Sequence, residues 1–260
     1  MKTQIYKVDS DNIDNSVIGK AAEIIKSGGL VAFPTETVYG LGGDGLNPSA
    51  SKKIYSAKGR PSDNPLILHI SHISQLERLV KEIPDMAVKL AKEFWPGPLT
   101  MIFKKSDIVP KETSGGLDTV AVRFPENKIA QALIRASGTP IAAPSANTSG
   151  RPSPTRASHV EFDLDGKIDM IIDGGACEFG LESTIVDVTG EVPCLLRPGS
   201  ITLEMLREVL GRVDVDKAVV TKLDAGELPK APGMKYTHYS PSADVVIVRG
   251  DRDKMVHKIN

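Results

Sequence analysis

The chain of 260 residues has few cysteines and no long apolar run, and each of these absences excludes some classes of protein. Its two cysteines, Cys177 and Cys194, are too few and too loosely spaced for a disulfide framework or a zinc site. Both stand beside apolar, strand-like runs, so we expect buried free thiols. The first residues, MKTQIYKVDSDN, lack the apolar centre of a secretory signal, and no later run is long enough to span a membrane. We therefore expect a cytoplasmic protein with no membrane partner.

A surplus of charge of one sign is also lacking. The formal net charge is −1, so the chain as a whole does not attract nucleic acid or an anionic membrane. Any anion site must therefore come from local placement of Lys and Arg. The content of 40% hydrophobic and 25% charged residues fits a globular protein with a sizeable core, organised as one large domain or one domain plus a fragment.

Strand-like and helix-like segments alternate along the chain, which predicts an α/β (α+β) fold with a twisted mixed sheet and helices packed on it. The expected strands are 30–33, 66–70, 99–103, 120–124, 141–143, 170–172, 185–188 and 194–196. The expected helices are 13–29, 48–57, two segments within 73–94, 127–136 and 203–210. We expect Asn15 or Ser16 to cap the first helix and Gly28 to end it. The glycines between Gly40 and Gly43 allow close approach to a neighbour or a ligand.

The stretch 142–155, which ends in PSANTSGRPSPT, is the first candidate site. It follows an apolar strand and consists of hydroxyl, small and proline residues, so it cannot form a core. A loop that leaves the end of a buried strand is a usual place for a ligand in an α/β sheet. A plain surface loop is the alternative.

Several charged or aromatic residues stand next to rigid turns. Lys58 and Arg60 flank the expected helix end at Gly59, where interaction with the helix dipole would by itself explain them. Arg123 lies inside an apolar strand, so we expect a carboxylate or phosphate partner for it. A lone strand histidine such as His69 is more often a core residue than a catalyst. Trp95 is expected to anchor the turn WPGP.

Eight motifs in order carry a family resemblance. They are VAFPTETVYGLG (31–42), AKGRPSDNPLILHI (57–70), FWPGPLT (94–100), AVRFP (121–125), PIAAPSANTSGRPSPT (140–155), IIDGG (171–175), ESTIVDV (182–188) and LLRPG (195–199). Over roughly residues 5–212 the chain resembles the YrdC-like family of threonylcarbamoyl-AMP synthases. The segment APGMKYTHYSP (231–241) resembles the interdomain linker of the long form of that family.

The resemblance implies a domain organisation. Residues 1–212 would form a YrdC-like catalytic domain with a concave, cationic face. Residues 213–243 would be an interdomain linker. From the aromatic, Pro-bounded composition of 231–241 we further hypothesise that this part folds over the nucleotide as a lid, with Tyr236 reaching the site. Residues 244–260, with a strand at 245–248, would begin a Rossmann-like C-terminal domain that is incomplete here, so the chain resembles a truncated long form.

The resemblance also implies a reaction: L-threonine, bicarbonate and ATP give L-threonylcarbamoyl-AMP, pyrophosphate and water, which serves N6-threonylcarbamoyl modification of adenosine 37 in tRNA. The expected ATP contacts are Lys58, Arg60, Asn64, Thr119, Ser145, Ser153, Arg197 and Tyr236, with Asn147 in support. Lys58 and Arg60 would neutralise the transferring phosphate. The expected threonine contacts are Thr35, His69, Arg123, Ala143 and Ser183, with Arg123 on the carboxylate.

Such a reaction needs positioning and neutralised charge rather than an enzyme nucleophile, and no nucleophile–base pair stands out in the sequence. Mg²⁺ should accompany ATP, held mostly by phosphate oxygens and water because no carboxylate cluster is evident. Downstream partners would be tRNA or tRNA-modification proteins. The alternative is an RNA-binding module that uses the cluster from Lys52 to Arg60. The near-zero net charge and the lack of aromatic residues on the candidate strands weigh against it.

Overall fold

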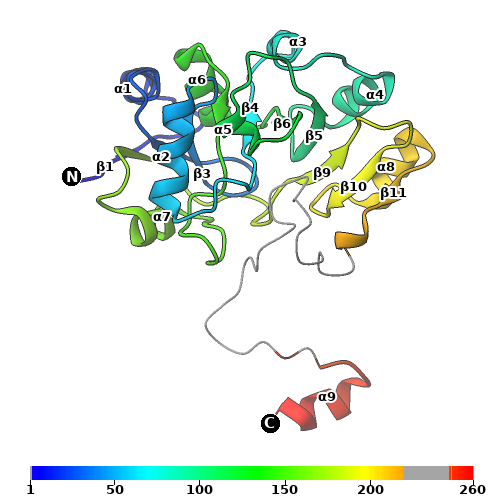
Figure 1. The fold of residues 1–260 in the computed structure, drawn as a ribbon. Coiled ribbons are helices and arrows are strands. Elements are labelled where there is room, and N and C mark those ends of the chain that lie inside the picture. The colour runs from blue at the N-terminus through cyan, green and yellow to red at the C-terminus, as the bar shows by residue number, and fades with distance from the viewer. Residues whose placement is uncertain (1, 220–245, 247, 260) are drawn as a thin grey trace.

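A mixed β-sheet organises the computed structural model, which describes residues 2–219, 246 and 248–259 (Figure 1). The strand order is β1-β8-β2-β3-β7-β4-β6-β5-β9-β10-β11. In chain order the strands are Gln4–Lys7, Val31–Phe33, Gly40–Asp44, Ile67–His69, Leu99–Lys104, Thr119–Arg123, Ile141–Ala142, Met170–Asp173, Thr184–Asp187, Cys194–Arg197 and Asp214–Val215. Parallel pairs such as β4–β6 and β5–β9 alternate with antiparallel pairs such as β5–β6 and β9–β10. The predicted mixed α/β fold is confirmed.

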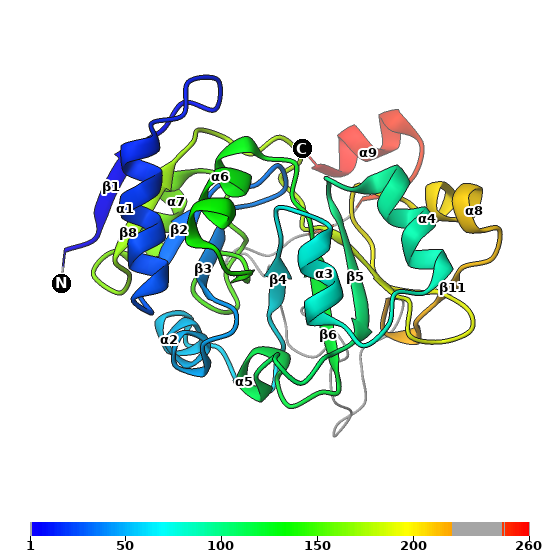
Figure 2. The ribbon, with the colours of Figure 1, turned by 90° about the horizontal axis from the view of Figure 1, so that it is seen from above.

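Helices pack on this sheet in groups (Figure 2). The helices α1 to α9 are Asn15–Lys26, Pro48–Lys58, Ser74–Leu79, Asp85–Phe94, Lys111–Ser114, Lys128–Ser137, Ala157–Leu164, Leu203–Leu210 and Arg252–Ile259, and a 3₁₀ turn covers Lys217–Val219. Helices α1 and α6 lie side by side and bury Ile25 and Leu133 in one apolar cluster with Phe33 of β2. A larger cluster joins α2, α3, α4, α7 and α8 to the central strands.

Helix ends follow local capping chemistry. Asn47 accepts a hydrogen bond from the Ser49 N–H at 2.9 Å, and α2 ends at Gly59 with φ +61°, as predicted. The expected cap of α1 is wrong by one residue. The Asp14 carboxylate accepts from the Ser16 N–H at 2.8 Å, and Ser16 Oγ also bonds to Asp14 rather than capping the helix. Asp14 is the cap because its oxygen reaches the free N–H groups of the first turn.

The glycine-rich stretch is a strand rather than a loop. At Gly42 in β3 a Cβ atom would lie 2.8 Å from both Ile141 Cγ2 and Phe33 Cε1. The glycines therefore permit close packing between neighbouring elements. Of the two alternatives that the sequence left open, a neighbour or a ligand, Gly42 approaches a neighbour. Helices α5, α7 and α9 and strands β1, β3 and β11 were not predicted from the sequence.

Other sequence predictions have mixed outcomes. The Trp95 indole donates to the Leu99 carbonyl at 2.7 Å, which confirms its role as an anchor of the turn. Cys177 and Cys194 are free thiols but are half-buried rather than buried, because each lies where the sheet meets a loop or an edge. Burial raises the pKa of the Cys177 thiol to about 11, so this thiol stays protonated at neutral pH.

The C-terminal predictions fall largely outside the described residues. Tyr236 and the rest of 220–245 lie there, and the proposed domain boundaries remain predictions. Of the expected strand 245–248, the structure describes Val246 and Val248, and neither is in a strand. Within the described ranges no helix combines the length and the apolar character that crossing a membrane requires.

Candidate active site

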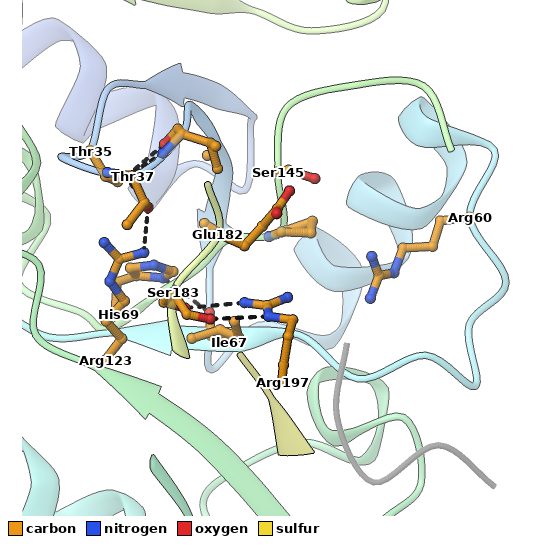
Figure 3. Close-up of a pocket in the computed structure, with 14 residues that line it drawn as sticks. Thr35, Thr37, Arg60, Ile67, His69, Arg123, Ser145, Glu182, Ser183 and Arg197 are labelled. Carbon is orange, nitrogen blue, oxygen red and sulfur yellow. Dashed lines mark hydrogen bonds between the residues drawn. The ribbon is translucent and has the colours of Figure 1, made fainter. Parts of the chain in front are cut away.

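A pocket opens where several strands end and loops from distant parts of the chain meet (Figure 3). Its lining consists of Thr35, Thr37, Val38, Gly40, Arg60, Ile67, His69, Arg123, Ala143, Pro144, Ser145, Glu182, Ser183 and Arg197. Eight of the residues predicted from the sequence meet here: Thr35, Arg60, His69, Arg123, Ala143, Ser145, Ser183 and Arg197. The sheet therefore gathers one set of candidates from segments more than 150 residues apart.

Arg123, at the end of β6, is held in a buried ion pair. Its Nη2 lies 2.5 Å from Glu36 Oε1, and each side chain is 4% exposed. The predicted carboxylate partner of Arg123 is therefore confirmed, and it comes from the protein itself. The other oxygen of Glu36 accepts from the backbone N–H groups of Glu126 at 3.2 Å and Asn127 at 3.4 Å. Burial would raise the pKa of Glu36, but the Arg123 charge and these hydrogen bonds lower it below its ordinary value.

The guanidinium of Arg123 retains donors for a ligand. Its Nε donates to the Gly97 carbonyl at 3.3 Å and its Nη1 donates to Thr37 Oγ1 at 2.9 Å. With the bond to Glu36, these contacts use three of the five N–H groups that a guanidinium carries. One N–H on each terminal nitrogen has no partner among the described residues. That pair of donors matches the two oxygens of a carboxylate.

His69, on β4, is in register with Arg123 and is buried. Its Nδ1 lies 3.2 Å from the Ile67 carbonyl, an acceptor, so the proton belongs on Nδ1 and Nε2 is left as an acceptor. Burial, and then the nearby Arg123 charge, lower the pKa of His69 to about 3. His69 is thus both a core residue and a neutral part of the pocket wall.

Lys58 does not line the pocket. It is 2% exposed, and its ammonium group lies beneath the loop 142–155. There Nζ donates to the Ser145 carbonyl, to the Asn147 carbonyl at 2.5 Å and to Asn147 Oδ1 at 3.4 Å. Burial, followed by repulsion from Arg60, lowers the pKa of Lys58 well below its ordinary value. The structure therefore gives Lys58 a contact with the loop backbone rather than with the open pocket.

The loop is also held from α7. Asp163 accepts from the Thr148 N–H at 2.9 Å and from Arg151 Nη1 at 2.6 Å. Within the loop, Ser145 Oγ donates to Asn147 Oδ1 at 2.6 Å. The Asn147 amide donates to two further loop carbonyls. A segment without a core of its own is therefore fixed by polar contacts from two helices and by its own side chains.

Arg197 and Ser183 form another part of the pocket wall, apart from the loop 142–155. Arg197 Nε donates to the Ser183 carbonyl at 3.0 Å, and Nη2 lies 3.1 Å from Ser183 Oγ. The same hydroxyl is 2.8 Å from Thr100 Oγ1 on β5. Glu182, next in the chain, accepts a hydrogen bond from Ser153 Oγ. In Figure 3 Glu182 stands between the Arg123 side and the Arg60 side of the pocket.

Some predicted residues are not brought to the pocket wall. Asn64 is buried beside Arg60, its carbonyl accepts from Tyr55 Oη at 3.1 Å, and its Oδ1 is buried without a hydrogen-bond partner. Thr119 begins β6 opposite Lys104 and is half-buried. Asn147 lies within the loop and accepts from the buried Lys58, and Ser153 donates to the lining residue Glu182. Tyr236 is outside the described residues.

Seven residues at or beside the pocket were not identified from the sequence: Glu36, Thr37, Val38, Gly40, Ile67, Pro144 and Glu182. The available signal for Glu36 was an acid three residues after the end of an apolar strand. Glu182 had a comparable signal, since it lies two residues before the start of another such strand. In the described ranges no group of three or more His, Cys, Asp or Glu side chains is arranged to hold a metal ion. The pocket can therefore bind anions through three arginines and orient them with hydroxyl groups.

Comparison with known proteins gives a consistent picture. Residues 23–199 match the Sua5–YciO–YrdC family model, described as telomere recombination, and residues 201–259 match the model described as threonylcarbamoyl-AMP synthase, C-terminal domain. A threonylcarbamoyl-AMP synthase of Pyrococcus abyssi is 55% identical over 249 residues, covering 96% of this chain and 73% of the relative. One of Bacillus subtilis is 51% identical over 263 residues, covering 100% and 75%.

The fold agrees with these sequence matches. The crystal structure of P. abyssi Sua5 complexed with L-threonine matches with a TM-score of 0.94 at 55% identity, covering 99% of this chain and 75% of that one. This match confirms the YrdC-like fold that the motifs implied. By sequence and by structure, the chain belongs to the threonylcarbamoyl-AMP synthase family.

Proposed function

We propose that the chain is an L-threonylcarbamoyladenylate synthase, which uses L-threonine, bicarbonate and ATP. The observation that carries this proposal is Arg123, which has two unused N–H donors and lines a pocket together with Arg60 and Arg197. A site for an amino acid carboxylate thus adjoins a site for phosphates. The P. abyssi relative, which has the same fold, was crystallised with L-threonine.

Threonine would occupy the Arg123 side of the pocket. Its carboxylate would take the two unused N–H groups of Arg123 as a bidentate pair. Neutral His69 would offer Nε2 as an acceptor, and Thr35 and Ser183 would offer hydroxyl groups. Ala143 would close the apolar wall around the side chain. These roles assign each expected threonine contact to a residue that lines the pocket.

ATP would occupy the Arg60 and Arg197 side, with Ser145 as a neighbouring hydroxyl. Lys58 would act as a positioning residue that holds the loop 142–155 in place through its carbonyl oxygens. Asn64, Thr119, Asn147, Ser153 and Tyr236 remain proposed contacts of the nucleotide. A Mg²⁺ bound to the triphosphate would be held mainly by phosphate oxygens and water, since Glu182 is the one carboxylate among the described lining residues.

The chemistry follows from this arrangement. The threonine amine and bicarbonate form a carbamate and water, and a carbamate oxygen then attacks the α-phosphorus of ATP as pyrophosphate leaves. Both reactants are anions, so the arginines lower the cost of bringing them together and stabilise charge in the transition state. The product would then serve threonylcarbamoyl modification of adenosine 37 in tRNA, with tRNA or tRNA-modification proteins as downstream partners.

The structure lends little support to the alternative, a module that binds duplex RNA through the cluster from Lys52 to Arg60. Lys52 is paired with Glu112 at 3.3 Å, and Lys53 donates to the Gly28 carbonyl at 2.7 Å. Lys58 is buried. Binding of tRNA that weakens steeply with salt, together with no effect of threonine on thermal stability, would favour this alternative.

The proposal is tested by pyrophosphate release from ATP and Mg²⁺. We expect release that requires both threonine and bicarbonate, and a loss of about 10²- to 10³-fold in kcat/KM for Arg60→Ala and Arg197→Ala, as for other charge-stabilising groups. Lys58→Ala belongs in the same series. Lys52→Ala, an exposed cation on the same helix as Lys58, is the matched control and should leave the rate unchanged. Folded protein that releases no pyrophosphate with all substrates present would contradict the proposal.

A further inference from the structure

Glu182 is an unexpected residue in this pocket. It is the one carboxylate among the 14 described residues of a lining that otherwise carries three arginines. A carboxylate repels phosphate groups, so its presence in a site for anions is best used by a ligand that also carries a positively charged group. The nucleotide itself carries no such group, and its Mg²⁺ is proposed above to be held mainly by phosphate oxygens and water. A zwitterionic amino acid does carry one, because it has an ammonium group beside its carboxylate.

The sheet places Glu182 at a suitable distance from Arg123. Glu182 lies two residues before the start of β9, and Arg123 ends β6. Strand β5 lies between them, paired with β6 on one side and β9 on the other. Arg123 and Ile185 are both in register with Thr100, so two strand spacings and three further residues along the chain separate Arg123 from Glu182. The gap between the backbones is therefore about 14 Å, which two side chains and one small zwitterion between them can fill.

The contacts of Glu182 fix its orientation. Its Oε1 accepts from Ser153 Oγ, which belongs to the loop on the proposed nucleotide side. Its chain neighbour Ser183 is fixed by Arg197 and Thr100. Figure 3 shows Glu182 between Thr37 and Ser145, at the junction of the two halves of the pocket. The nitrogen of threonine must reach this junction, because the carbamate that forms on it attacks the nucleotide.

We propose that Glu182 binds the α-ammonium group of threonine and so selects α-amino acids over α-hydroxy acids. This inference rests on the proposed function and deepens it. Arg123 holds the carboxylate of the substrate and Glu182 holds its nitrogen, with the nitrogen turned toward the loop 142–155. The two opposite charges define both the class of the substrate and its direction in the pocket.

The test compares two ligands on two proteins by calorimetric titration. L-threonine is compared with 2,3-dihydroxybutanoate of matching configuration, which has a hydroxyl in place of the ammonium. We expect wild-type protein to bind threonine about 10- to 100-fold more tightly, the range for a hydrogen bond to a charged group. In Glu182→Gln this ratio should fall close to one through weaker threonine binding, with hydroxy acid binding unchanged. The Gln oxygen still accepts from Ser153, and thermal melting checks that the variant is folded.

The controls separate this inference from the function on which it rests. Glu178→Gln removes an exposed carboxylate from the same loop and should change neither affinity. Wild-type protein that binds no threonine would overturn the proposed function and this inference together. If wild-type protein binds threonine and Glu182→Gln binds it with the same affinity, the inference alone would be overturned. Equal weakening of both ligands, or an effect confined to ATP, would instead assign Glu182 to pocket shape or to the nucleotide.

Discussion

Replacing Glu36 with alanine should lower the free energy of unfolding by about 3–5 kcal/mol, the usual cost of removing one partner from a buried ion pair. The variant leaves Arg123, which is 4% exposed, without its charge partner. It also removes the acceptor for the N–H groups of Glu126 and Asn127 at the start of α6. Equilibrium unfolding in urea measures the change. Glu178→Ala is the control, an exposed glutamate whose loss should cost less than about 0.5 kcal/mol. A decrease in the free energy of unfolding of less than about 1 kcal/mol for Glu36→Ala would contradict a stabilising role of the ion pair.

The pH dependence of the same pair provides a second readout. The folded state lowers the pKa of Glu36 below its ordinary value of 4.5. Above pH 4.5 the carboxylate is charged in both states, and its stabilising contribution is fully present. This contribution is lost as the pH falls through the lower pKa of the folded state. The stability difference between wild type and Glu36→Gln should therefore be largest near neutral pH and shrink in acid. If the stability difference between wild type and Glu36→Gln grows in acid, the pKa of Glu36 is not lowered in the folded state.

Replacing Lys58 with methionine should lower kcat/KM for pyrophosphate formation by about 100-fold, because a displacement of about 1 Å near reacting groups has an effect of this size. Methionine fills the volume of the lysine stem but donates no hydrogen bond. The Ser145 and Asn147 carbonyls would then lose their donor. The free energy of unfolding of Lys58→Met should therefore fall by about 1–3 kcal/mol, the usual cost of buried acceptors left without a partner.

A steady-state assay with ATP as the varied substrate measures the effect of Lys58→Met, and urea unfolding measures its stability. Lys52→Met tests the same change at an exposed position of α2 and should be neutral in both measurements. If Lys58→Met retains activity within threefold of wild type, Lys58 does not position the loop. Loss of activity with unchanged stability would favour direct contact with the nucleotide, as the family resemblance implied.

The sequence predicted elements that have strong local signals. Helix α2 has a capping Asn47, a proline in its first turn and Gly59 at its end, so both limits were predictable. Strand β3 was not, since glycines are read as loop residues, and their packing against Ile141 depends on a strand 100 residues away. Helix α5 has four residues, too few to show a period.

The candidate site was predictable in part for a similar reason. The need of Arg123 for a carboxylate followed from the cost of a buried charge, but the identity of Glu36 did not. The two residues are 87 positions apart, and only the strand order brings them together. Lys58 follows the same logic. Its position at a helix end indicated a cation near a turn, whereas its burial beneath Ser145 depends on the path of a distant loop.

The hydroxyl of Ser183 has a thermodynamic consequence. It lies within hydrogen-bond distance of Arg197 on the proposed nucleotide side and of Thr100, the β5 residue in register with Arg123. A ligand that takes over this hydroxyl on one side alters the donor set that the other ligand meets. Because such coupling is reciprocal, any factor by which threonine changes the affinity for ATP must equal the factor by which ATP changes the affinity for threonine. One shared hydroxyl thus couples the affinities of the two substrates by the same factor in either direction.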